Sequence, residues 1–416
     1  MNWGLFTLLK RLELDSQGNY RLVSVVLLHA THARFHETAD LPQIGPDRKE
    51  EDVMQRFLSV LCTIAVLALL MALVLPNPVA AQSKEINRAP ASADTSGHPL
   101  HLNVDAASGH KVHVMPTPAQ VKGVTDIGYQ HNGGTPPLLY NGGPVMHSPK
   151  VYVIYWVPPK LQDGTATSLS SGYQSIETTM LNEYFGHSLM NNNTQYYDSK
   201  YIKNVGSVGG TYVDKSAYPG SDCYDPATVL TNGNNCISDT DLQNEITKVM
   251  ALKHWVGGVD NLFMVFTSSN EGQCAISDSD CSYSNYCAYH SYFVDAANAY
   301  VIYSNEPYGN TTNCQVSGAP SPNGNPDADT AATAAAHELT ESITDPLIDA
   351  WLDSSGYEIG DECAYYYGYA LWDGGNATNQ WDGHNFYIQT MYDNLAQGFY
   401  LTDVNFTGCM NVGPEL

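Results

Sequence analysis

One alanine-rich segment with a short charged motif constrains the fold of this chain more than any other feature. The segment from Ala331 to Trp351 begins with residues that favour a helix. It reaches Pro346, which pushes the residue before it out of the helical conformation. Asp329 and Thr330 stand where an N-cap is expected. The sequence therefore predicts a largely buried helix that ends just before Pro346.

This predicted helix carries the motif HELTE, which suggests metal chemistry. His337 and Glu341 are four residues apart, so they project from the same helix face. A zincin helix presents two metal ligands with this spacing, and the position of Glu338 is that of the catalytic base. Glu341 replaces the usual second histidine. Because unpaired charges are rare on a buried helix, we expect a metal site; the alternative is a solvated, purely structural helix face.

A catalytic zinc site needs a third protein ligand, and the turn EIGDEC offers carboxylates for it. Asp361 is the first candidate, Glu358 the second, and His290 on a predicted strand the third. Asp345 continues the helix face eight residues after His337 and is expected to position that histidine. Zinc is the expected cofactor, and calcium or manganese are alternatives because oxygen-rich sites also accept them.

The N-terminal part predicts export. Residues 54–81 combine a basic residue, an apolar run and small residues before Gln82, as a secretory signal peptide does. We expect cleavage after Ala81, with residues 1–53 a spurious extension; the alternative is a membrane anchor, because the apolar run could span a bilayer. Residues 82–137 lack an apolar period and predict a linker or pro-segment, in which His113 is solvated.

Charge and cysteine content agree with a secreted protein. The net charge is −25, and nearly all of it lies after Ala81, so nucleic acid and anionic lipid are excluded as partners. Eight cysteines follow the predicted signal, an even number that indicates disulfides in an exported chain. We expect the pairs Cys223–Cys236 and Cys363–Cys409. The other four are expected to pair among themselves; they are Cys274, Cys281, Cys287 and Cys314.

The order of predicted elements indicates an α+β fold. A single large domain over residues 138–416 is expected, with a mixed central sheet, packed helices, the motif helix and an irregular, disulfide-bearing C-terminal part. The predicted strands cover residues 151–156, 195–202, 210–213, 261–266, 287–293, 299–303 and 385–392. The other predicted helices cover residues 168–190 and a segment that starts at Ser238, where Ser-Asp-Thr-Asp forms a capping signal.

Several motifs together resemble the exordium or phosphate-induced protein family, in particular its bacterial secreted members. These motifs run in order over residues 138–411, and they are NGGPVM, VYVIYW, CAYH, PNG, HELTESITDPLIDAW, EIGDEC and FYIQTMYDN. The resemblance implies an extracellular or cell-wall-associated protein and does not supply an established enzymatic activity. The positions matching the family that could do chemistry are His337, Glu338, Glu341 and the acidic pair Glu358 and Asp361.

Two functions follow as hypotheses. The first is a secreted zinc-dependent metallohydrolase, most simply a peptidase, in which Glu338 takes the proton from bound water. The second is a non-enzymatic extracellular protein that binds a cell-wall polymer or another partner, with the motif as a structural or vestigial metal site. The substrate is accordingly expected to be a peptide or a cell-wall polymer. No P-loop, Rossmann fingerprint or G-x-S-x-G elbow points to another chemistry.

Overall fold

The computed structural model describes the chain in segments, which are residues 7–14, 20–27, 101–103, 111–119, 121, 124–125, 128–129, 137–226, 234–311, 313–315, 319–368, 377–395 and 408–412. The chain divides into two compact units, Met1–Val79 and Ala80–Leu416. The described part of the first unit is an antiparallel hairpin of β1 (Thr7–Leu14) and β2 (Tyr20–Leu27). The predicted signal peptide and its cleavage site lie outside the described residues and stay predictions. Within residues 82–137, predicted as a linker or pro-segment, residues 101–103 and 111–116 form strands of the central sheet.

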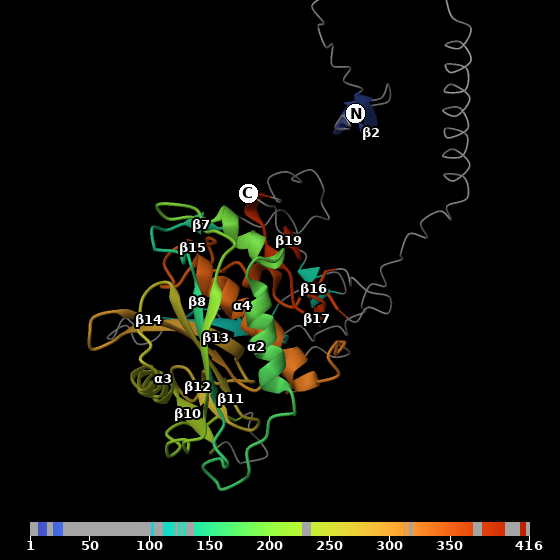
Figure 1. Cartoon of the computed structure of the whole chain (residues 1–416). Helices are drawn as coiled ribbons and strands as arrows, with labels where there is room; N and C mark the ends of the chain where they lie inside the picture. The colour runs from blue at the N-terminus through green and yellow to red at the C-terminus, as the bar shows by residue number, and fades with distance from the viewer. Residues whose placement is uncertain are drawn as a thin grey trace, which may run out of the picture. The chain divides into compact units, whose positions relative to one another are not determined.

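A seven-stranded mixed sheet forms the centre of the second unit, as the α+β prediction requires (Figure 1). Its strand order is β3-β4-β13-β14-β11-β8-β9. The neighbours from β14 to β9 pair in parallel, and the neighbours from β3 to β14 pair antiparallel. The strands are β3 (His101–Asn103), β4 (Lys111–Pro116), β8 (Lys150–Trp156), β9 (Ser207–Asp214), β11 (Asn261–Thr267), β13 (Tyr286–Val294) and β14 (Tyr300–Glu306).

Helices cover both faces of this sheet, so its central strands are buried on both sides. Val151, Val153 and Tyr155 of β8 pack in one core with α2 (Tyr173–Tyr184) and α4 (Pro326–Thr344). The alternate residues Tyr152, Ile154 and Trp156 pack in a second core with α3 (Asp239–Lys253). Figure 1 shows α2 and α4 side by side, in agreement with their contacts. No helix in the described ranges is both long and apolar enough to cross a bilayer.

Short elements complete the described structure. The 3₁₀ helices are η1 (Leu189–Gln195) and η3 (Asp361–Cys363). The short strands form two-stranded pairs: β5 (Val124–Thr125) with β6 (Gly128–Tyr129), β7 (Leu139–Tyr140) with β15 (Trp351–Leu352), β10 (Cys236–Ser238) with β12 (Gly272–Cys274), β16 (Asn379–Trp381) with β17 (His384–Phe386), and β18 (Met391–Tyr392) with β19 (Cys409–Met410).

Four disulfides join the cysteines of the second unit. Cys223–Cys236 and Cys363–Cys409 form as predicted. The other four cysteines pair among themselves, also as predicted, and the pairs are Cys274–Cys281 and Cys287–Cys314. The pair Cys363–Cys409 ties the turn after Glu358 to the C-terminal strand β19, so the acidic turn is held covalently.

Three predictions about local structure are wrong. The segment 195–202 is not a strand; η1 ends at Gln195, and an irregular loop follows. The late strand over 385–392 is split into β17 and β18, because the intervening residues bond to other parts of the chain, such as the backbone N–H of Gln389 to the Thr333 hydroxyl. The motif helix begins at Pro326 with Asn325 as its N-cap, whereas Asp329 accepts hydrogen bonds from Asn323 and Ser321.

Candidate metal centre

The motif helix α4 is buried almost throughout, and its charged residues point into the protein. Pro326 occupies the first helical position, where its missing N–H costs nothing, and Asn325 caps the backbone N–H of Ala328. The helix ends at Thr344, directly before Asp345 and Pro346, as predicted. His337, Glu338 and Glu341 are each 0% exposed, which rules out the solvated helix face.

Two ligands predicted on α4 lie together with the acidic turn. His337 Nε2 is 3.0 Å from Glu341 Oε1 and 3.7 Å from Asp361 Oδ1. Single donor atoms of these three residues all lie within 4.8 Å of one another. The backbone N–H groups of Gly360 and Asp361 both donate to Glu341 Oε1 at 3.1 Å, which fixes the turn against the helix. The first-choice ligand set is therefore assembled in space.

Glu358 and His290 lie on the other side of this group. Glu358 Oε1 is 3.7 Å from His290 Nε2, and both side chains are 0% exposed. His290, on β13, also places Nδ1 3.2 Å from Glu338 Oε2 and 3.7 Å from Glu341 Oε2. Glu338, predicted as the catalytic base, thus contacts a histidine of the sheet.

His113 is not among the predicted ligands, and the expectation that it is solvated is wrong. Lys111–Pro116 forms β4 of the central sheet, so His113 is 0% exposed and lies directly opposite His290 in the antiparallel register. Its Nε2 is 2.6 Å from Asp361 Oδ2, and its Nδ1 is 3.3 Å from Glu358 Oε1. The alternation Val-His-Val-Met before Pro116 was the available signal, because it is the pattern of a strand with the histidine on one face.

Asp345 does not position His337, contrary to the prediction. Its Oδ1 accepts the backbone N–H groups of Asp349 and Ala350, both at 2.7 Å. Asp345 therefore stabilises the turn that follows α4. The residue beside His337 is Gln389, whose Nε2 is 3.0 Å from His337 Nδ1 and donates to Gly360 O at 2.8 Å.

Burial controls the electrostatics of this cluster. It lowers the pKa of His113 to about 3 and that of His337 to about 4, so both imidazoles are neutral near pH 7. Burial, reinforced by neighbouring carboxylates, raises the pKa of Glu338, Glu341 and Glu358 well above the usual range. Without a cation these carboxyls hold protons, and a bound divalent cation would replace them.

Seven side chains make up this cluster, which we call the α4 cluster: His113, His290, His337, Glu338, Glu341, Glu358 and Asp361. They come from β4, β13, α4 and the turn at η3, so both the sheet and the helix hold the donors in place. Neutral imidazoles and carboxylates are the ligands that zinc and manganese accept, and three histidines disfavour calcium.

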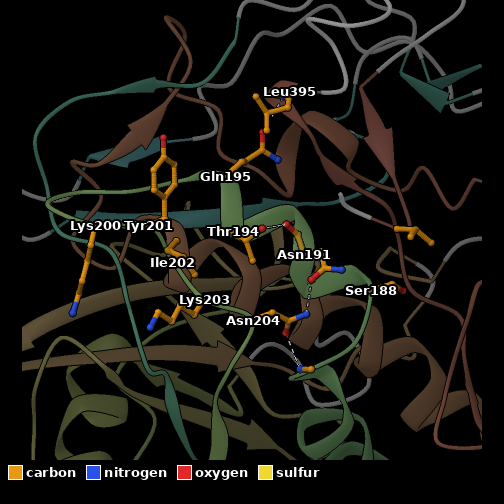
Figure 2. A pocket seen from close by; sticks show the side chains of 12 residues that line it. Ser188, Asn191, Thr194, Gln195, Lys200, Tyr201, Ile202, Lys203, Asn204 and Leu395 are labelled. Atoms are coloured by element: carbon orange, nitrogen blue, oxygen red, sulfur yellow. Dashed lines mark hydrogen bonds between the residues drawn. The ribbon is translucent and has the colours of Figure 1, made fainter. Parts of the chain in front are cut away.

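A separate pocket lies beside η1 and the loop of residues 200–204 that follows it. Its volume is about 1190 Å³, and Figure 2 shows its lining. The lining residues include Asn191, Lys200, Tyr201, Lys203 and Asn204. No residue of the α4 cluster lines it.

Comparison of the chain with protein-family models, with curated proteins and with solved structures finds no match. The resemblance to the exordium family therefore stays a prediction based on the motifs.

Proposed function

We propose that this protein is a zinc-binding, exordium-like extracellular protein and that it acts as a metal-dependent hydrolase, with peptides as its substrate class. The ion is held by His337, Glu341 and Asp361. Four disulfides support an oxidising compartment, since such bonds persist outside the cytosol. Export through the predicted signal peptide belongs to the same proposal.

A single observation carries the metal site. His337 Nε2 and Glu341 Oε1 lie 3.0 Å apart, yet the geometry of this approach makes no hydrogen bond. Two donors at about 2.0–2.2 Å from one tetrahedral zinc ion lie roughly 3.3–3.6 Å apart, close to the spacings among His337, Glu341 and Asp361. His337 Nε2 is buried without a hydrogen bond, which is costly unless a cation lies beside it, and Glu341 Oε1 is held in place by the backbone N–H groups of Gly360 and Asp361.

The proposed reaction assigns a role to each residue on α4. A zinc ion supplies a Lewis acid that polarises water and the scissile carbonyl. Glu338 Oε1 accepts no hydrogen bond in the structure, so this oxygen has the capacity to take a proton from water. With two carboxylates and one imidazole as ligands, a zinc ion here would lower the pKa of water less than a His₂Glu site does, which would favour activity on the alkaline side of neutrality.

One observation favours a second candidate function. Every residue of the α4 cluster is at most 3% exposed, and the described pocket near η1 does not reach it. A metal enclosed in this way stabilises a fold, as structural zinc does, without meeting a substrate. The second candidate is therefore a non-enzymatic extracellular binding protein with a structural metal.

Two measurements on the purified chain separate these candidates. Zinc content is measured first, and casein cleavage is then compared for wild type and Glu338→Gln. The matched control is Glu177→Gln, because Glu177 is an equally buried glutamate on the neighbouring helix α2 and belongs to none of the candidate metal groups.

The hydrolase proposal predicts bound zinc, with cleavage in wild type and Glu177→Gln and no cleavage in Glu338→Gln. Bound zinc without cleavage in any of the three, together with a lower melting temperature after chelation, supports the structural candidate. A chain that binds no zinc refutes both.

A further inference from the structure

The carboxylate of Glu341 faces two different sets of imidazoles. Its Oε1 lies 3.0 Å from His337 Nε2. Its Oε2 lies 3.7 Å from His113 Nε2 and 3.7 Å from His290 Nδ1, on the sheet side of α4. Glu341 belongs to each of the three histidine-containing groups in the described residues whose donors are close enough for a metal. A carboxylate placed in this way is suited to bridge two ions.

The sheet side has its own set of donors around Glu358. His113 and His290 are cross-strand neighbours with ring centroids 5.4 Å apart. Glu358 Oε1 lies 3.3 Å from His113 Nδ1 and 3.7 Å from His290 Nε2, again near the roughly 3.3–3.6 Å expected for two ligands of one tetrahedral ion. Glu358 is 0% exposed, and neither of its carboxylate oxygens has a hydrogen bond.

The hydrogen bonds assign which imidazole nitrogens face Glu358. His113 Nε2 lies 2.6 Å from Asp361 Oδ2; with Asp361 ionised, the neutral ring would carry its proton on Nε2 and turn the Nδ1 lone pair toward Glu358. His290 Nδ1 lies 3.2 Å from Glu338 Oε2; with Glu338 ionised, Nδ1 would donate to it and the Nε2 lone pair would face Glu358. A carboxylate behind each metal-binding histidine is the usual arrangement around metal sites, and it fixes the tautomer of each ring.

The number of carboxyls in the cluster leaves room for a second ion. Four carboxylates belong to the α4 cluster, and in the described part of the chain Glu338, Glu341 and Glu358 approach histidines and no lysine or arginine at ion-pair distance. With one divalent ion bound, about two of the four carboxyls keep their protons, and a second ion would replace those protons and leave the site neutral. Two divalent ions balance the four carboxylates.

We propose that the α4 cluster binds two divalent metal ions with Glu341 as the bridge. The first ion is the one of the proposed function, and the inference rests on that site. The second is held by His113, Glu358 and Glu341, a group whose donor atoms all lie within 4.8 Å of one another. Metal pairs in hydrolytic sites are about 3.5–4 Å apart, a separation that one bridging carboxylate spans. In this arrangement Glu338 contacts His290 on the sheet side of the two ions.

Metal stoichiometry of the intact chain tests the proposal. The protein is saturated with zinc, freed of excess ion and measured by mass spectrometry of the metal against protein concentration. We expect two zinc ions per chain in wild type, one in Glu358→Gln and two in the matched control Glu177→Gln. One ion in wild type, kept in Glu358→Gln and lost in His337→Ala, overturns the second site and leaves the proposed function standing. No ion in wild type overturns both.

A titration with cobalt gives a readout that needs no variant to fold. Visible absorption from bound cobalt is expected to rise until two equivalents have been added, and the paramagnetic resonance signal per cobalt is expected to fall as the second ion couples to the first through Glu341. Absorption that saturates at one equivalent overturns the proposal.

Discussion

Gly360→Ala is the smallest change that perturbs the α4 cluster. A Cβ on Gly360 would lie 2.7 Å from His337 Nδ1, 2.8 Å from Glu341 Oε1 and 2.9 Å from His337 Cε1. The backbone of Gly360 has φ −82, so alanine adds no backbone strain, and the effect is purely one of space. The methyl group must displace His337 and Glu341, two of the proposed metal ligands, or the turn, or both.

The expected magnitude follows from these contacts. Overpacking of a buried site costs about 1–3 kcal/mol, and in a domain of this size each kcal/mol lowers the melting temperature by roughly 2 °C. Displacing His337 and Glu341 would also weaken the proposed metal site, and we expect a loss of about 10–100-fold in zinc affinity, as for other changes next to ligands. Thermal unfolding and calorimetric zinc titration measure the two effects.

Gly220→Ala is the matched control for this prediction. A Cβ on Gly220 meets nothing within 4 Å, and its backbone is not in the left-handed region. We expect this variant to bind zinc as wild type does and to be equally or slightly more stable, because alanine restricts the unfolded chain. If Gly360→Ala matched Gly220→Ala in both stability and zinc affinity, the close packing of the turn on the ligands would be refuted.

Three further predictions concern the surroundings of the site and the fold. Gln389→Leu removes the side-chain amide beside His337 Nδ1. When zinc is bound at His337 Nε2, Nδ1 carries the proton, and the Gln389 amide must turn its oxygen toward Nδ1 to accept it. Zinc affinity measured by calorimetry should therefore fall about 10–100-fold in this variant, and an unchanged affinity would contradict this role of Gln389. Burial raises the pKa of Glu271 from 4.5 to about 8, so the folded state holds the proton more tightly and wild type loses stability as the pH rises through this range. The free energy of unfolding in urea should be higher for Glu271→Gln than for wild type by roughly 3–5 kcal/mol at pH 9 and by little near pH 4.5. A difference that does not change with pH would argue against this assignment. Replacing the pair Cys363–Cys409 by serines should lower the free energy of unfolding by about 4 kcal/mol, and replacing Cys274–Cys281 should lower it by about 2 kcal/mol, because the loops that they close are 46 and 7 residues long. Equal losses of stability in denaturant would show that loop entropy does not set the contribution of each disulfide.

Much of the fold could be predicted from local sequence. The strand at β8, the helix at α3 with its Ser238 capping box, and the end of α4 before Pro346 each follow from signals within a few residues. The mixed sheet and the two named disulfides were also predicted. The N-cap at Asn325 was missed because the preference of Asp329 for a cap was satisfied elsewhere, by hydrogen bonds to Asn323 and Ser321.

The candidate site was only partly predictable, for a physical reason. His337 and Glu341 are brought together by one helical turn, which sequence spacing reveals. His113 comes from a strand more than 200 residues earlier, and only the register of β4 on β13 places it opposite His290. No local pattern encodes that pairing, since a strand is positioned by its neighbours in the sheet.

An anomalous difference map from crystals of the zinc-loaded protein, recorded at the zinc absorption edge, tests the central claim most directly. We predict a peak about 2 Å from His337 Nε2, Glu341 Oε1 and Asp361 Oδ1, inside the α4 cluster. A map without a peak among these atoms, from protein whose cluster is folded as described, would contradict the account.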